Sequence, residues 1–131
     1  MIYAEVDELG RLDLADMERL LIENDGKIKY VSITAASNVT GYVNDVHAIA
    51  KLGHEHGAQI VAHRAFSMIG NTPEENIDFF VFFAHKMYSP FGGGAVVGLT
   101  DVLNEHLPTF YGGGIVDVVA DYEVTFLEAP D

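Results

Sequence analysis

Apolar positions recur along the chain with two different spacings, one typical of helices and one typical of strands. Helical spacing follows Asp13, a residue type that caps helices, and appears again after the loop at residues 36–42. The apolar faces of these two predicted helices consist of Leu14, Met17, Leu20 and Leu21 in the first and Val43, Val46, Ile49 and Ala50 in the second. Gly57 is well placed to end the second helix, because glycine adopts the left-handed conformation that follows many helices.

Runs of β-branched and aromatic residues separate these helices and predict strands. The predicted strands are residues 2–6, 28–35, 58–62, 77–84, 94–99 and a stretch near 122–128. Residues 28–35 are expected to form a buried strand, residues 68–76 a loop or short helix, and residues 101–107 a short helix. Because strands and helices alternate, we expect an α/β fold in which a mostly parallel sheet carries helices on both faces.

The composition is that of one globular domain, and it narrows the range of functions. Apolar residues make up 49% of the 131 residues, and the formal net charge is −13. A charge of this size repels nucleic acid and anionic membranes, so neither is an expected partner. The acidic residues are scattered, which favours a solubilising surface over a docking patch for a basic partner.

The cysteine count and the hydropathy of the chain indicate the cellular compartment in which the protein is expected. There is no cysteine, so disulfides and thiolate chemistry are excluded. The longest apolar run, residues 79–84, is too short to span a bilayer, and the first residues lack the features of a signal peptide. We therefore expect an intracellular, cytoplasmic protein.

Lys86 closely follows the aromatic run that forms a predicted strand. Ligands of α/β sheets bind at the carboxyl ends of strands, and burial there would favour the neutral amine that a Schiff base requires. The alternative is a surface lysine whose stem packs on the protein while its ammonium group reaches water. Asn38 also follows a predicted strand, and its alternative explanation is an Asx turn that leads into the second helix.

Two further patterns have both a functional and a structural interpretation. The glycines at 92–94 would let the backbone approach a ligand, but they match neither nucleotide-binding glycine pattern, and a turn leading into a strand is the simpler explanation. His47 and His54 share a helical face, and His54 and His56 flank Glu55, but this is not the spacing of a zinc-protease motif. Solvated histidines at a helix end are favoured, and no metal is expected.

The order of these segments resembles the class V aminotransferase family of pyridoxal-phosphate (PLP) enzymes, in particular its cysteine desulfurase and selenocysteine lyase branch. The resemblance covers nearly the whole chain. It rests on Ser-Asn-Val-Thr-Gly at 37–41, the strand ending in His-Lys at 85–86, Tyr-x-Pro-x-Gly-x-Gly at 88–94 and Gly-Gly-Gly at 112–114. It implies that residues 1–131 form the middle of the large, cofactor-binding domain of a fold type I PLP-dependent transferase, without the small domain.

The resemblance also implies roles for three residues. Lys86 matches the catalytic lysine that forms a Schiff base with pyridoxal 5'-phosphate. His85 matches the neighbouring residue near the cofactor phosphate, and Asn38 matches the asparagine that approaches the cofactor or the substrate carboxylate. The substrate implied by the family is an amino acid such as cysteine.

Departures from the family pattern affect the same site. The family has Val-Asp-x-Ala-Gln after this strand, and its aspartate pairs with the pyridinium nitrogen of the cofactor. Here Val61 is followed by Ala62, His63 and Arg64, so about six residues are missing relative to the usual strand-to-loop length. Phe83 replaces a serine that bonds the cofactor phosphate, and no arginine of the chain matches the one that binds the substrate carboxylate in the family.

Three functional hypotheses follow from these observations. The first is a piece of a PLP-dependent lyase or transferase that uses Lys86. The second is a truncated or degenerate, non-catalytic remnant that keeps the fold core and an association surface. The third is a small anion-binding module that uses the glycines at 92–94. The missing aspartate predicts weak cofactor binding and little activity by this chain alone, and uncovered apolar surface predicts a homo-oligomer.

Overall fold

The computed structural model describes residues 1–65, 67–88, 92–103, 116–119 and 124–126. The chain divides into two compact units, Met1–Leu99 and Thr100–Asp131. All the candidate residues from the sequence, Asn38, His85 and Lys86, belong to the first unit. Among the described residues, no helix has the length and apolar character needed to cross a membrane.

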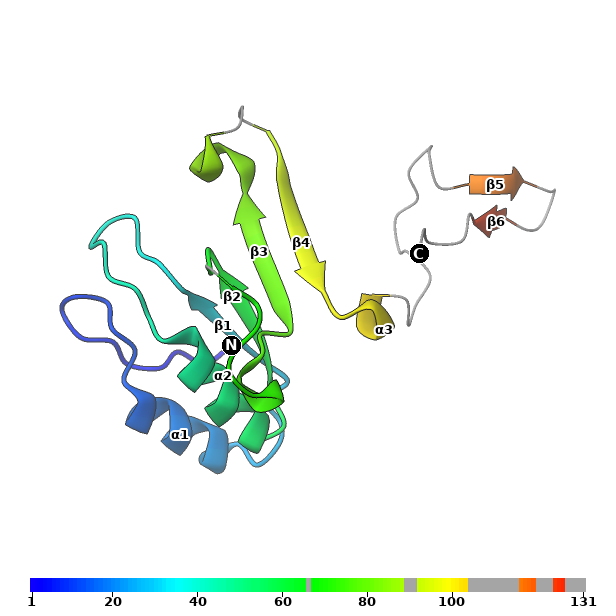
Figure 1. Ribbon diagram of the computed structural model, residues 1–131. Coiled ribbons are helices and arrows are strands. Elements are labelled where there is room, and N and C mark those ends of the chain that lie inside the picture. The colour runs from blue at the N-terminus through cyan, green and yellow to red at the C-terminus, as the bar shows by residue number, and fades with distance from the viewer. Residues whose placement is uncertain (66, 89–91, 104–115, 120–123, 127–131) are drawn as a thin grey trace. The chain divides into compact units, whose positions relative to one another are not determined.

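A four-stranded sheet forms the centre of the first unit (Figure 1). The strands lie in the order β1-β2-β3-β4, with the bounds Tyr30–Thr34, Gln59–His63, Phe79–Phe83 and Gly94–Gly98. β1, β2 and β3 run parallel, and β4 runs antiparallel to β3, which confirms the predicted mostly parallel α/β fold. Thr34 pairs with His63, and His63 pairs with Val81, so the parallel strands end at one edge of the sheet, here called the strand-end edge.

The first helix of this unit begins at its predicted cap, Asp13, and the second ends just before the predicted glycine, Gly57. In α1 (Leu14–Glu23), the Asp13 carboxylate accepts hydrogen bonds from the backbone N–H groups of Ala15 and Asp16 at 2.9 and 3.2 Å. α2 (Val46–Glu55) is capped by Asp45 and is followed by Gly57 in the left-handed conformation, with φ +74°. These side-chain oxygens bond N–H groups that have no partner within the helix, which is why the helices begin there.

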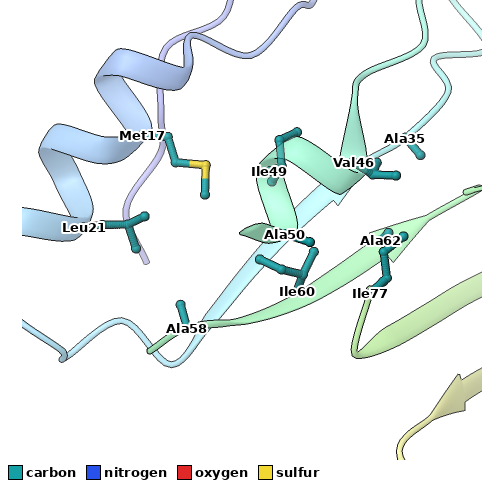
Figure 2. Packing of buried hydrophobic residues seen from close by; sticks show 10 residues of the cluster. All are labelled: Met17, Leu21, Ala35, Val46, Ile49, Ala50, Ala58, Ile60, Ala62 and Ile77. Atoms are coloured by element: carbon teal, nitrogen blue, oxygen red, sulfur yellow. The ribbon is translucent and has the colours of Figure 1, made fainter. Parts of the chain in front are cut away.

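The hydrophobic core lies between these two helices and one face of the sheet. Figure 2 shows Met17 and Leu21 of α1 directed toward Ile49 of α2 and Ile60 of β2. Ile49 and Ile60 are almost completely buried, and burial of side chains of this size contributes about 1.5–3 kcal/mol each. Only alternate residues of β2 are buried, which is the pattern of a sheet covered on a single face. Both helices therefore pack on that face. The sequence predicts helices on both faces, and the described residues place α1 and α2 together on one.

Three local predictions differ from the structure. Residues 2–6 contribute only an isolated bridge, between Val6 and Leu12, instead of a strand. β1 is not buried: Tyr30 is 57% exposed, because β1 is the outermost strand of the described sheet and alternate side chains face away from the helices. Val43 precedes α2 and is 48% exposed, because the cap at Asp45 starts the helix later than its apolar spacing suggests.

The second unit contains α3 (Thr100–Leu103) and an antiparallel pair, β5 (Val116–Val119) and β6 (Val124–Phe126). α3 falls within the predicted helix at 101–107 apart from its first residue, and β6 within the strand predicted near 122–128. β5 is not among the predicted strands, although its sequence, Val-Asp-Val-Val, is rich in β-branched residues. The glycines at 112–114 lie outside the described residues.

Candidate functional site

The strand-end edge brings together residues that are far apart in the sequence. Asn38 lies four residues beyond the end of β1, Arg64 lies directly after β2, and Lys86 lies three residues beyond the end of β3. Because these strands are parallel neighbours, the predicted placement of Asn38 and Lys86 at one edge of the sheet is confirmed. This is the edge at which open α/β sheets bind ligands.

Lys86 is held in a single tight turn. β3 continues directly into the 3₁₀ helix η2 (Ala84–Met87), which ends at Tyr88 in the left-handed conformation, with φ +64°. The backbone N–H of Ala84 donates to the carbonyl of Gly93 at 3.0 Å, which ties this turn to the start of β4. The turn leaves the Lys86 side chain exposed. The described residues therefore do not bury its amine, as a strand-end position would have favoured.

The glycines next to Lys86 serve the hairpin between β3 and β4. Gly92 has φ +98°, a conformation that favours glycine, and Gly94 already pairs with Phe83 in the sheet. A Cβ atom on Gly94 would lie 2.9 Å from the carbonyl oxygen of Phe82. The structural interpretation of these glycines, a turn leading into a strand, is therefore the correct one for Gly92 and Gly94.

Phe83, which replaces a serine of the family pattern, packs between two histidines. Its ring meets His63 edge-on, with the ring centroids 5.2 Å apart, and lies 5.8 Å from the ring of partly buried His85. This contact links the end of β2 to η2 through apolar surface. At position 83 the phenyl ring therefore makes packing contacts, whereas the serine of the family pattern has a hydroxyl that could donate to a phosphate.

Asn38 contacts Arg64, a residue to which the sequence assigned no role. Its side-chain oxygen accepts a hydrogen bond from Nη1 of Arg64 at 2.7 Å. The turn around Asn38 is made by Ser37, whose hydroxyl accepts from the N–H groups of Val39 and Thr40, so the Asx-turn explanation of Asn38 is wrong. Arg64 has φ +65°, an uncommon conformation for a residue with a side chain.

Arg64 and His63 both line a cavity of about 390 Å³ at the strand-end edge. Burial and the neighbouring Arg64 guanidinium lower the pKa of His63, which favours the neutral form of its ring. Among the described residues, Nε2 of His63 and Nε of Arg64 are buried without a hydrogen-bond partner. A larger cavity of about 690 Å³ lies between the N-terminal segment, α1 and β1, and none of the candidate residues lines it.

The cavity residues do not fit the whole of pyridoxal 5'-phosphate. A protonated pyridine nitrogen needs a carboxylate partner, and no aspartate or glutamate is among the described residues that line this cavity. Lys86 does not line it either. The strand-end edge therefore provides an accessible amine and a set of cationic and neutral donors. Such a set fits negatively charged groups and leaves a pyridinium without a counter-charge.

The histidines of α2 act in packing. Nδ1 of His47 and Nδ1 of His54 lie 2.8 and 2.7 Å from the carbonyl oxygens of Glu75 and Glu74 in the 3₁₀ helix η1 (Pro73–Glu75). Nε2 of His54 also lies 2.8 Å from Oδ2 of Asp78. The predicted shared face of His47 and His54 is confirmed, but the prediction of a solvated His54 is wrong.

Relatives of known sequence and structure resemble this chain over most of its length. A family model described as Aminotransferase class-V matches residues 1–131. A cysteine desulfurase from Haloferax volcanii is 36% identical, with 98% of this chain and 30% of that protein covered. A probable cysteine desulfurase from Treponema pallidum is 36% identical, with 95% of this chain and 31% of that protein covered.

Solved structures show the same relationship. The apo structure of a cysteine desulfurase from Thermococcus onnurineus matches with a TM-score of 0.78 and 27% identity, over 98% of this chain and 32% of that one. The chain thus spans about a third of the length of these three proteins. The family match, the sequence identities and the fold agree, and the chain belongs to the class V aminotransferase family.

Proposed function

We propose that this chain is a cofactor-domain segment of a PLP-dependent lyase or transferase that acts on an amino acid such as cysteine, with Lys86 as the lysine that carries the cofactor. The observation that supports this role most directly is the position of Lys86 in the turn after β3, at the strand-end edge. Its side chain is exposed, so the amine is accessible to an aldehyde from solvent. When bound, this cofactor supplies the electron sink for chemistry at the amino-acid α-carbon.

The same geometry limits how tightly this chain holds the cofactor. The cavity residues contain no carboxylate for the pyridine nitrogen, and the Phe83 ring packs against His63 and His85 where the family has a serine. The glutamine that ends the family's Val-Asp-x-Ala-Gln pattern is also absent from the segment after β2. Two charge-assisted hydrogen bonds, to the pyridinium and to the phosphate, and one neutral hydrogen bond together correspond to about three to five orders of magnitude in affinity. We therefore expect weak binding that still depends on Lys86.

A titration with pyridoxal 5'-phosphate followed by visible absorbance tests this proposal. The intact chain should give a weak, saturable signal that Lys86→Ala abolishes and that Lys51→Ala preserves, since Lys51 is an exposed lysine of α2, far in sequence from η2. Borohydride reduction followed by peptide mass mapping should place the covalent modification on Lys86. An adduct spread over several lysines and unaffected by Lys86→Ala would refute the role of Lys86.

A second candidate function, a non-catalytic remnant with an association surface, is favoured by the exposed apolar residues of the sheet. Tyr30 of β1, Phe83 of β3 and Val96 of β4 are 57%, 46% and 58% exposed. Apolar surface of this kind drives association, so a homo-oligomer is expected. Analytical ultracentrifugation at several protein and salt concentrations measures this self-association. Self-association without any Lys86-dependent cofactor signal would favour this second candidate, and a strict monomer would count against it.

A further inference from the structure

The cavity of about 690 Å³ beside β1, here called the β1 groove, is mostly apolar and has positively charged side chains at one end. Its described lining comes from residues 1–12, from α1 and from residues 27–33. Lys27 and Lys29 carry the only charged side chains among the described lining residues, although the chain has a formal net charge of −13. Neither lysine forms a salt bridge with the described residues. The groove therefore suits an apolar ligand that also carries a negative charge.

One wall of the β1 groove is an unpaired edge of the sheet. β1 has β2 as its only neighbour among the described strands (Figure 1). The carbonyl of Lys29 accepts from the N–H of Gln59 at 2.9 Å, so Lys29 and every second residue after it face β2. The backbone groups of Tyr30 and Ser32 therefore point away from β2, and no other described segment forms a backbone hydrogen bond with them. Such an edge is a template for a further strand.

The opposite wall also contains strand-forming residues without strand partners. Residues 2–6 are predicted to form a strand, yet Val6 contributes only an isolated bridge to Leu12. Among the described residues, the backbone groups of Met1–Ala4 take part in no hydrogen bond. An extended segment placed in the groove would thus meet unpaired backbone groups in both walls and apolar side chains along its length.

We propose that the β1 groove binds an extended segment of a separate polypeptide, which pairs with β1 as an added strand and brings an acidic residue to Lys27 and Lys29. In this mode of binding, main-chain hydrogen bonds supply affinity and alternate side chains supply specificity. An aliphatic acid would match the apolar surface and the charge, but it would leave the backbone of Tyr30 and Ser32 unpaired. The site needs neither Lys86 nor a cofactor, so it stands or falls separately from the proposed function.

A second copy of this chain complements the same edge less well. Antiparallel pairing of two β1 strands about Ser32 would set Ala35 of one copy opposite Lys29 of the other, and Ser37 opposite Lys27. Neither Ala35 nor Ser37 is acidic, so this pairing would leave both lysines without a counter-charge. A different segment, apolar and with a carboxylate near one end, satisfies the backbone edge and the charges together.

The experiment is a titration of the intact chain into a fluorescently labelled peptide, Glu-Val-Thr-Val-Thr-Val-Glu, followed by fluorescence anisotropy. Glutamate at both ends lets either strand direction bring an acid to Lys27 and Lys29. This peptide should bind saturably. A peptide with lysine in place of both glutamates should bind about tenfold more weakly or less. The same loss is expected for a peptide that is N-methylated at each internal residue, because it lacks the backbone donors of a strand.

Variants of the chain test whether the peptide binds at the β1 groove. Lys29→Glu reverses one of the two charges, so the affinity should fall by about threefold to tenfold. Ser32→Pro removes an N–H that points away from β2, and proline is tolerated in edge strands, so the sheet should survive and the affinity should fall by about tenfold. Circular dichroism checks the fold of each variant. Lys51→Glu is the matched control, because it makes the same charge change on α2 and Lys51 does not line the groove.

The outcomes separate strand pairing from other kinds of binding. Saturable binding that Lys29→Glu and Ser32→Pro weaken and Lys51→Glu leaves unchanged would establish the site. Absence of saturable binding would overturn the proposal, and so would equal weakening by Lys29→Glu and Lys51→Glu, because only net charge would then matter. Equal binding of the N-methylated peptide would overturn strand pairing in favour of an apolar anion. Self-association that Ser32→Pro abolishes, without peptide binding, would overturn it in favour of a second copy.

Discussion

Replacing His54 by alanine should destabilise the first unit, and the loss should be greatest at low pH. Both ring nitrogens of His54 face hydrogen-bond acceptors: Nδ1 faces the carbonyl oxygen of Glu74 and Nε2 faces the carboxylate of Asp78. Only the doubly protonated ring donates to both. The ring joins the end of α2 to η1 and to the residue before β3, so its removal loosens three segments at once.

The pKa of His54 gives the direction of the pH dependence. Burial lowers this pKa, but the hydrogen bonds to Asp78 and to the Glu74 carbonyl, together with the charges of both acids, outweigh burial and raise it above 6.5. A group whose pKa is raised by folding stabilises the protein fully below its unfolded pKa. That contribution is then lost as the pH rises through the folded pKa. The stability difference should therefore be largest below about pH 6.5.

The expected magnitude follows from the contacts. Hydrogen bonds to charged groups contribute about 1.5–3 kcal/mol and neutral ones about 0.5–1.5 kcal/mol. The side chains of His54 and Asp78 are 25% and 12% exposed, so solvent screens this pair only in part. We expect His54→Ala to lower the free energy of unfolding by about 2–3 kcal/mol at acidic pH, and by about 1 kcal/mol once the ring is neutral.

Urea unfolding at pH 5.5, 7 and 9, followed by circular dichroism, measures this difference. His56→Ala is the matched control, since His56 caps the same helix end and its side chain makes no hydrogen bond to the described residues. A stability difference between the wild type and His54→Ala that stays constant across these pH values would refute the reasoning. The same would follow if His56→Ala reproduced the pH dependence.

Two further substitutions test the packing and capping of the helices. Gly53→Ala should destabilise the chain by about 1–3 kcal/mol despite the better helix propensity of alanine, because the new Cβ would lie 2.5 Å from Cδ1 of buried Ile60. Thermal unfolding checks this, and an unchanged or higher midpoint would show that Ile60 moves aside. Asp13→Ala should cost about 1 kcal/mol, because the N–H groups of Ala15 and Asp16 lose their acceptor. Urea unfolding with an unchanged midpoint would contradict that role.

Local signals in the sequence were enough to predict most elements of the fold. Asp13 and Gly57 mark helix ends through short-range hydrogen bonding and backbone conformation, which neighbouring residues largely determine. The mostly parallel sheet follows from the alternation of strands and helices, and from it follows the placement of Asn38 and Lys86 at one edge. These predictions succeeded because each depends on nearby residues and on general rules of chain connection.

Tertiary structure decided what these rules leave open, above all burial and long-range contact. The apolar composition of residues 28–35 did not reveal that β1 is the outermost strand and leaves alternate side chains uncovered. The spacing of the histidines did not reveal that His54 meets Asp78, 24 residues away. Nor did the sequence pair Asn38 with Arg64, 26 residues apart, because that contact exists only once β1 and β2 are aligned in register. Side-chain environment depends on which segments become neighbours, and local sequence does not encode that directly.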